Sequence, residues 1–414
     1  MHEVDGLSPK VSKQEGPATL ARPHVGWIGY MGFAAQIPWS TILVHLPILE
    51  PVLGGKSFSF AVGIAMGLAC NLMRFLVVVW GRKFTFAFRV VSGAVLSALF
   101  VLGYFFIYVA SSPLTVAEMT SAVATESVGF WVGLTLALLG GAGNAQLMST
   151  GYGVASIVSL DVPVANSLFF FGQAMAAATC WPLKETVESF APSFESHLGI
   201  VMGIISLVAL SIVPVFFGRV AKFPRIATSE IQEAVKMAQI RKVLRASLFP
   251  VLMLWSTYFC TNLVTPGQLL QWPLPETDSV SPFLTDPKKY RSLSAYVHLV
   301  SDAAGKMLPV FLAIRSSNIQ AIIRAKCTPL VVLALLTVRM GLVPLFYFPP
   351  ATAWARFVLL AAFGLLNGSA ASVALSLASA RVQPDESDVI GYLCSFAIIN
   401  GLFVGSLVGM LSRL

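Results

Sequence analysis

The sequence predicts an all-α polytopic membrane protein with eleven transmembrane helices. Of the 414 residues, 56% are hydrophobic and only 11% are charged, whereas about a quarter of the residues of a soluble domain are charged. The hydrophobic residues are gathered in eleven runs, which are long enough as helices to cross a hydrocarbon core ~30 Å thick. The chain is therefore expected to lie in a lipid bilayer.

The eleven hydrophobic segments follow a polar tail and differ in length. They lie at residues 25–49, 58–81, 84–110, 128–160, 164–183, 197–221, 248–271, 292–314, 326–348, 352–379 and 388–412. The fourth is too long for one simple span, and its Gly140-Gly141-Ala142-Gly143 sequence predicts a bend or a close helix contact rather than a second crossing.

The connections predict four regions. Residues 1–24 form a polar cytosolic tail, residues 25–221 a bundle of six helices, and residues 248–414 a bundle of five. The basic connection at 222–247 between them suits either an amphipathic helix at the membrane surface or a solvated linker. The Pro-rich stretch at 272–291 is expected to be an irregular external loop.

The positive charges predict the orientation. The net charge is +8, and its placement between hydrophobic runs favours topology over nucleic-acid binding, for which we find no motif. If the N-terminus is cytosolic, 16 Lys and Arg residues lie on the inner side and 7 on the outer side, by our count. This asymmetry places the N-terminus inside and, after eleven crossings, the C-terminus outside. The plasma membrane is the expected location.

The sequence offers little support for an enzyme. The five cysteines are scattered singly, so we expect no disulfide framework, no metal centre and no cofactor. GxSxG, HExxH, paired Cys and P-loop motifs are missing, so no catalytic residues are assigned.

Asp302 and Lys306 are the most informative residues. Both lie near the middle of the eighth segment, where a charge costs about 2.5–3.5 kcal/mol, so such residues face a bundle interior or a water-filled path. Their i, i+4 spacing puts both heads on one helix face, with the acid in the favourable N-terminal position. They are candidate substrate-binding residues. The alternative is an ion pair that only holds helices together.

The first segment contains Gln36, Pro38 and Trp39, which combine an amide, a helix-bending proline and a large flat ring. An aromatic face suits stacking on a planar ligand. Trp in membrane proteins is often an interface anchor, but anchors lie at span ends and Trp39 lies near the centre. We therefore interpret Gln36 and Trp39 as substrate-binding. His45 has either a structural role or a proton-relay role.

Other polar residues in the segments have two interpretations each. Gln173 follows Gly172 on a small-residue surface, so its amide can bind the edge of a heterocycle or bond a neighbouring helix. Arg339 lies deep in the ninth segment and needs a partner, with a structural or gating role. Arg74 and Arg89 lie closer to the cytosolic ends and can snorkel.

Five short motifs resemble those of equilibrative nucleoside transporters. Gln36-Ile-Pro-Trp39-Ser is similar to their first-span Leu-Leu-Pro-Trp-Asn, and Gly172-Gln173 to their fifth-span Ser-Gly-Gln-Gly. Asp302-Ala-Ala-Gly305-Lys306 resembles their Asp-x-x-Gly-Arg, and the Arg339 to Pro344 stretch their Arg-x-x-x-x-Pro. The fifth motif begins at Asn367-Gly-Ser369 and continues through Arg381-Val382 to Glu386 and Gly391. The motifs span nearly the whole chain in the family's order.

This resemblance implies a fold like that of the major facilitator superfamily, in a 6+5 arrangement. It implies a nucleoside or nucleobase substrate, with Trp39 and Gln173 on the base side of the cavity and Asp302 and Lys306 on the ribose side. Lys306 replaces the family's Arg and loses its planar fork, and His298-Leu299 stands where Phe-Asn is common. His298 is therefore placed with Arg339 as gating or structural. The short external loop at about 51–57 fits a protist member.

Three functions remain open at this point. A facilitative transporter of purine nucleosides, working by alternating access as a monomer, is the leading prediction. A proton-coupled nucleoside or nucleobase symporter that uses Asp302 or a histidine is the alternative of the same class. A channel or receptor is the alternative of a different class, because eleven spans alone do not specify alternating access.

Overall fold

The structure is a computed structural model that describes residues 25–53, 56–80, 83–111, 122–162, 164–229, 237–264, 272–274, 287–315 and 328–411. All regular elements in these residues are helices. The predicted tail at residues 1–24 and Cys327 lie outside them.

Eleven long helices are present in this part of the chain, as the hydrophobic segments predict. They are α1 (Gly26–Leu53), α2 (Lys56–Trp80), α3 (Phe86–Ser111), α4 (Ala122–Val158), α5 (Ala165–Glu188), α6 (Phe194–Val215), α8 (Met237–Val264), α10 (Pro287–Arg315), α12 (Thr328–Leu342), α14 (Ala353–Ser379) and α15 (Ser387–Leu411). Short helical pieces are the π-helix η4 (Phe216–Val220), α7 (Pro224–Ser229), α13 (Pro344–Tyr347) and the 3-10 helix η6 (Pro384–Glu386).

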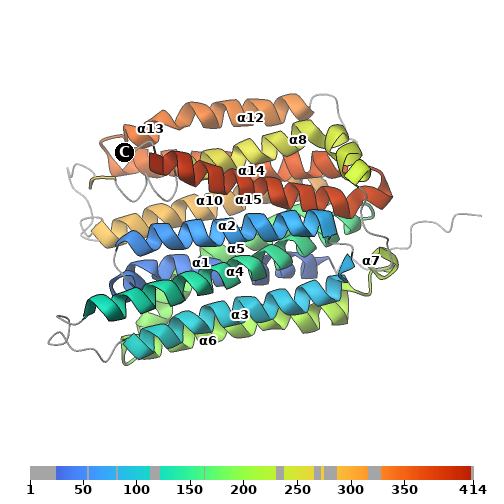
Figure 1. Cartoon of the computed structure of the whole chain (residues 1–414). Coiled ribbons are helices and arrows are strands. Elements are labelled where there is room, and N and C mark those ends of the chain that lie inside the picture. The colour runs from blue at the N-terminus through green and yellow to red at the C-terminus, as the bar shows by residue number, and fades with distance from the viewer. Residues whose placement is uncertain are drawn as a thin grey trace, which may run out of the picture.

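The long helices run alongside one another in two groups. In Figure 1 the later helices α8, α12, α14 and α15 lie above the earlier helices α1, α3, α4 and α6. Within the first group α1 packs on α5 and α4 on both α2 and α3, while α8 packs on α15 and α10 on α14 in the second. The groups meet where α5 contacts α10 and where α2 and α4 contact α15. The 6+5 arrangement is thus present, and the boundaries at 222–247 stay a prediction.

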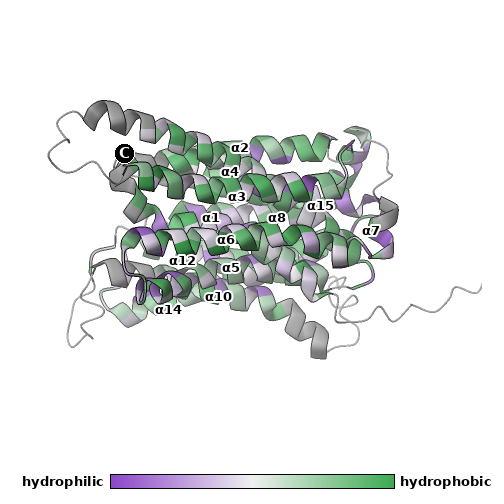
Figure 2. Ribbon diagram, turned by 90° about the horizontal axis from the view of Figure 1, so that it is seen from below, coloured by the Kyte–Doolittle hydropathy of each residue, from purple (hydrophilic) through white to green (hydrophobic). Residues whose placement is uncertain are grey.

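The outer faces of the helices are apolar. Seven helical spans of the described chain are long and apolar enough to cross a membrane. Four of them are the single helices α2, α3, α8 and α14, and three join neighbouring elements, namely α6 with η4, α12 with α13, and η6 with α15. Figure 2 shows the helices largely green, with purple residues gathered near α7. Large side chains such as Leu72, Leu207 and Val358 are more than half exposed. Since water would disfavour such a surface, these faces are suited to lipid.

The glycines of α4 allow close packing. A Cβ atom at Gly140 would overlap the Phe100 ring of α3, and one at Gly141 would lie 2.7 Å from the Met66 carbonyl oxygen of α2. A Cβ atom at Gly143 would lie 3.0 Å from the Gly93 carbonyl oxygen of α3. The run is therefore a close helix contact inside one continuous helix, and α4 does not cross twice.

The seventh segment is displaced from its prediction of 248–271. Helix α8 begins at Met237 and changes direction at Ser247, whose φ of −117° and ψ of 16° are not helical. The predicted segment does not include the first turns of α8 because these turns contain the charged residues Arg241, Lys242 and Arg245. Residues 237–246 are therefore helical, as the amphipathic interpretation proposed, and residues 230–236 lie outside the described chain.

The prediction that Arg74 and Arg89 snorkel is wrong. Both are 4% exposed and bond across the groups to α15. Nη1 of Arg74 donates to the Ser395 carbonyl oxygen at 2.7 Å, and Nη2 of Arg89 donates to the Tyr392 hydroxyl at 2.9 Å. A buried guanidinium needs such acceptors because burial without them is costly. The positions of the two arginines along their hydrophobic segments did not show that their side chains face another helix instead of lipid.

Contacts near α7 join the two groups at one end. The Asn166 amide of α5 donates to the Ser379 hydroxyl of α14 at 3.0 Å. At the same end Arg225 of α7 donates to the Asp161 carboxylate at 2.7 Å, and this hydrogen bond raises the pKa of the Arg225 guanidinium further. The bond from Asn166 to Ser379 therefore crosses the interface at this end, while the bond from Arg225 to Asp161 holds α7 to the turn after α4.

Candidate functional site

The Asp302 and Lys306 side chains form a buried ion pair in the middle of α10. Lys306 Nζ lies 2.6 Å from Asp302 Oδ2, and the two residues are 5% and 6% exposed. The predicted pairing on one helix face is thus present. Because desolvation of two charges is expensive, such a pair is weak evidence of a purely stabilising role.

Glycines bring α10 close to α14 around this pair. A Cβ atom at Gly368 would overlap the Asp302 carbonyl oxygen, and one at Gly305 would overlap the Leu365 carbonyl oxygen. No side chain separates the two backbones here, so the polar groups of α14 reach those of α10. The motif glycine at 305 is therefore needed for the close approach.

A polar network extends from Asp302 to Arg339. The Asn367 Nδ2 donates to Asp302 Oδ1 at 2.6 Å, and Thr261 Oγ1 donates to Asn367 Oδ1 at 3.0 Å. Arg339 is fully buried, and it donates to Thr261 Oγ1 at 2.7 Å and to the Thr257 carbonyl oxygen. The partners of Arg339 are therefore two threonines of α8. Together these hydrogen bonds connect α8, α10, α12 and α14.

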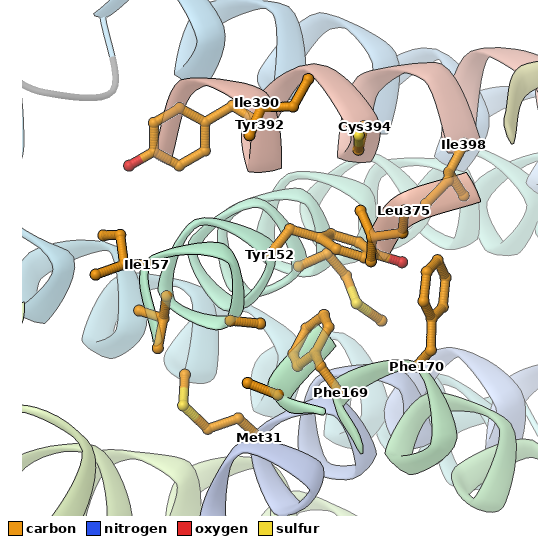
Figure 3. Packing of buried hydrophobic residues seen from close by; sticks show 14 of the residues in the cluster. Met31, Tyr152, Ile157, Phe169, Phe170, Leu375, Ile390, Tyr392, Cys394 and Ile398 are labelled. Carbon is orange, nitrogen blue, oxygen red and sulfur yellow. The ribbon is translucent and has the colours of Figure 1, made fainter. Parts of the chain in front are cut away.

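Aromatic rings of both groups converge beside Lys306. Lys306 Nζ lies 5.5 Å from the centre of the Phe170 ring of α5, within cation–π range. Phe170 stacks on Tyr258 of α8 with centroids 6.4 Å apart and planes 14° apart. The Tyr152 ring of α4 meets Phe170 edge-on at 5.4 Å, and Figure 3 shows its hydroxyl lying toward Phe170. The ion pair thus faces an aromatic surface where the helix groups meet.

Gln173 joins this neighbourhood through Tyr152. The Tyr152 hydroxyl donates to Gln173 Oε1 at 3.1 Å. Gln173 Nε2 is buried and has no hydrogen-bond partner in the described part of the chain. Buried polar atoms are nearly always bonded. The free amide donor is therefore suited to an acceptor on a ligand.

Gln36 and Trp39 lie in α1 without a contact to the ion pair. Gln36 Nε2 reaches Ser40 Oγ at 3.5 Å, and both Gln36 and Trp39 are half-buried. The Trp39 ring stacks on Phe100 of α3 with centroids 6.4 Å apart. The structure therefore brings together Gln173, Asp302 and Lys306 through Phe170 and Tyr152, and leaves the roles of Gln36 and Trp39 as predictions.

Replacement of Trp39 separates packing from ligand stacking. We expect Trp39→Ala to raise the KM for uptake by a factor that corresponds to about 1–3 kcal/mol, the value of a base stacked on an aromatic ring. Trp39→Phe keeps a ring and should have a smaller effect. The measurement is initial-rate uptake normalised to surface protein. Normal KM values for both variants would assign Trp39 to packing on Phe100.

Polar side chains continue along α10 from its first turns to the ion pair. Tyr290, Ser294, His298 and Asp302 recur every four residues, so they share one helix face. The Tyr290 hydroxyl, Ser294 Oγ and His298 Nδ1 are buried and have no hydrogen-bond partner among the described residues. The His298 ring lies 5.8 Å from that of Phe363 in α14. His298 is therefore part of a polar line inside the second helix group.

Sequence reasoning missed several members of the site. Asn367 was recognised only as part of a family motif, although an amide in mid-span is itself a signal for a buried bond. Phe170 lies in a run of three Phe residues that indicates core packing. Tyr152, Tyr258 and Thr261 have no spacing that separates them from other span residues.

The overall structure resembles solved transporters. A bacterial homologue of the iron transporter ferroportin, in an outward-facing state with soaked iron, matches with a TM-score of 0.63 and 11% identity over 94% of this chain and 92% of that chain. The E. coli fucose:proton symporter matches with a TM-score of 0.55 and 12% identity over 94% and 92%. A second structure of that symporter, described as a major facilitator superfamily transporter in the outward conformation, matches with a TM-score of 0.52 and 12% identity over 92% of this chain and 98% of that chain.

This chain has the major facilitator fold. The sequence matches no protein family description, and no curated protein matches it. Because the structural relatives share so little sequence, the likeness concerns the fold, and the major-facilitator-like architecture is confirmed. Asp302, Lys306 and Gln173 lie where the two helix groups of this fold meet, since α5 contacts α10 there.

Proposed function

We propose that this protein transports nucleosides across a membrane by alternating access. The observation that carries the proposal is the buried Asp302 and Lys306 pair facing Phe170 at the meeting of the two helix groups. Asp302 offers acceptor oxygens and Lys306 offers donors, which are the groups that sugar hydroxyls bind. The resemblance of five motifs to equilibrative nucleoside transporters supports the same substrate class.

The surrounding groups suit a base as well as a sugar. Phe170 and Tyr258 provide flat apolar rings, and stacking on an aromatic ring contributes about 1–3 kcal/mol per base. The free Nε2 of Gln173 can donate to a ring nitrogen or a carbonyl of the base. A hydrophobic surface with a few convergent polar groups is typical of small-molecule sites. Purine nucleosides, which offer both ribose and a large planar base, fit this combination best.

The contacts between the two helix groups favour an alternating-access mechanism and argue against a permanently open channel. Asn166 and Ser379 bond across the groups near α7, and Arg89 and Tyr392 do so on neighbouring helices. Each bond joins the first helix group to the second, so opening that end requires the groups to separate. A channel would need an open path past these bonds.

Competition uptake tests the proposal. Cells that lack endogenous nucleoside uptake would express the full chain, and uptake of labelled adenosine would be challenged with adenosine, inosine, uridine, hypoxanthine, glucose and fucose. We expect saturable uptake that nucleosides inhibit and the free sugars do not. Saturable uptake of labelled hypoxanthine without uptake of labelled adenosine would indicate a nucleobase carrier, and adenosine uptake that does not saturate would indicate a channel.

The polar line on α10 favours proton coupling as a second candidate. Tyr290, Ser294 and His298 each have a buried polar atom without a hydrogen-bond partner in the described part of the chain, and they lead along one helix face to Asp302. Bridging water could complete a proton path along it. Addition of substrate would then evoke an inward current or external alkalinisation. Uptake without either signal would show that transport is facilitative.

A further inference from the structure

Two histidines face each other outside the candidate substrate site. His45 lies on α1 and His197 on α6, with ring centroids 5.5 Å apart and planes tilted by 47°. The two residues are 0% and 1% exposed. Both therefore lie inside the first helix group, on elements that are distant in sequence.

Their ring nitrogens are only partly bonded. His45 Nδ1 lies 2.8 Å from the Thr41 carbonyl oxygen, so it acts as the donor and leaves a lone pair on Nε2. Nε2 of His45 and both nitrogens of His197 are buried without a partner among the described residues. A histidine that donates one N–H to a carbonyl and keeps a lone pair on its other nitrogen can act as a metal ligand with a supporting bond.

We propose that His45 and His197 bind one divalent transition-metal ion, such as Zn²⁺, that bridges α1 and α6. Zn–N bonds of about 2.0–2.1 Å in tetrahedral geometry place two imidazole centroids roughly 5 Å apart. The observed centroid separation of 5.5 Å is close to this distance. An ion here ties α6 to α1, the helix that carries Gln36 and Trp39.

The surroundings suit a site with two protein ligands. The described residues include no group of three or more His, Cys, Asp or Glu side chains that could hold a metal, so water would have to complete the coordination of the proposed ion. The carboxylates of Glu185 and Glu188 and the ammonium of Lys184, all on α5, act on His197 electrostatically with opposite signs. Lys184 lies 3.8 Å and 3.9 Å from these two carboxylates, which offset its charge.

The histidine pair lies close to the first turn of α6. His197 lies one turn from the N-cap residue Ser193, which is exposed. The nearby Cys180 thiol already donates to the Ala176 carbonyl oxygen at 3.1 Å, so we do not count it as a ligand.

A zinc titration of the purified full-length protein in detergent tests this proposal. After treatment with a chelator, equilibrium dialysis should find one Zn²⁺ per chain, and Zn²⁺ should raise the Tm because it binds only the folded state. His45→Gln and His197→Gln should each weaken the apparent zinc affinity by more than ~10-fold, since even partners of metal ligands contribute 10–100-fold. His298→Gln, a buried histidine elsewhere, should leave the affinity unchanged.

A ligand exchange keeps the test decisive if the glutamine variants do not fold. His197→Cys retains a metal donor but is softer, so binding should remain and shift in favour of Cd²⁺. Wild-type protein that binds no zinc, or glutamine variants that bind it with full affinity, would overturn the proposal. The measurement involves no transport, so its failure and the failure of nucleoside transport are distinguishable.

Discussion

Asp302→Asn is expected to reduce both the amount of folded protein and its transport. The change leaves the Lys306 ammonium buried without its carboxylate at 2.6 Å, and removal of one partner of a buried pair costs about 3–5 kcal/mol. Lys306→Met leaves Asp302 unpaired and should cost about as much. Surface protein and Tm in detergent measure the stability, and initial-rate uptake per surface protein measures the function.

A charge-free double variant separates structure from recognition. In Asp302→Asn with Lys306→Met the amide oxygen can still accept from Asn367, which donates to Asp302 at 2.6 Å in the wild type. Neutral replacement of a buried pair is often harmless to folding, so expression should return. Transport should not, because a hydrogen bond to a charged group contributes about 1.5–3 kcal/mol, roughly 10- to 100-fold in rate. A fully active double variant would show that the pair only holds helices together.

Lys306→Arg serves as the matched control for the pair. It keeps the charge and restores the residue of the family that the motifs resemble. We expect transport to persist with altered affinity, since Arg adds a bidentate fork but takes more room.

Gly172→Ala is expected to have the largest effect on folding among the glycine variants. A Cβ atom at Gly172 would overlap the backbone carbonyl of Gly29 and lie 2.9 Å from the Phe33 nitrogen, so α1 and α5 would have to separate. Overpacking of this kind costs about 1–3 kcal/mol, and more where the obstacle is backbone. The Tm in detergent and the surface amount should both fall.

Gly203→Ala provides the comparison for that variant. A Cβ atom at Gly203 of α6 would meet nothing within 4 Å, and Ala is better than Gly in a helix by about 0.5–1 kcal/mol. This variant should therefore keep or raise the Tm. An equal loss of Tm in both variants would contradict the close packing of α1 on α5.

The helix pattern of this fold was readable from sequence because lipid demands long apolar runs. All eleven segments correspond to long helices. Helix α10 covers the predicted 292–314 despite its two charges, but it begins at Pro287, inside the stretch that was expected to be loop. The seventh segment was misplaced because Arg241, Lys242 and Arg245 occupy the first turns of α8. Hydropathy measures the average of a window, so it does not detect a helix that starts with basic residues at the membrane surface.

The site was only partly readable. The pairing of Asp302 with Lys306 follows from i, i+4 spacing, which acts within one helix. The bonds of Asn367, Thr261 and Arg339 connect different helices, and their partners depend on how glycines such as Gly368 set the helix separation. Arg74 was misjudged for the same reason, since its acceptors lie on α4 and α15. Single-sequence patterns contain no information on which face meets which helix.

Counterflow in proteoliposomes tests the central claim most directly. Purified protein would be reconstituted into vesicles loaded with unlabelled adenosine, and the accumulation of external labelled adenosine would be followed. We expect transient accumulation above equilibrium that requires internal nucleoside and is absent in the charge-free double variant. Equal accumulation without internal nucleoside, or with only glucose inside, would contradict nucleoside transport by alternating access.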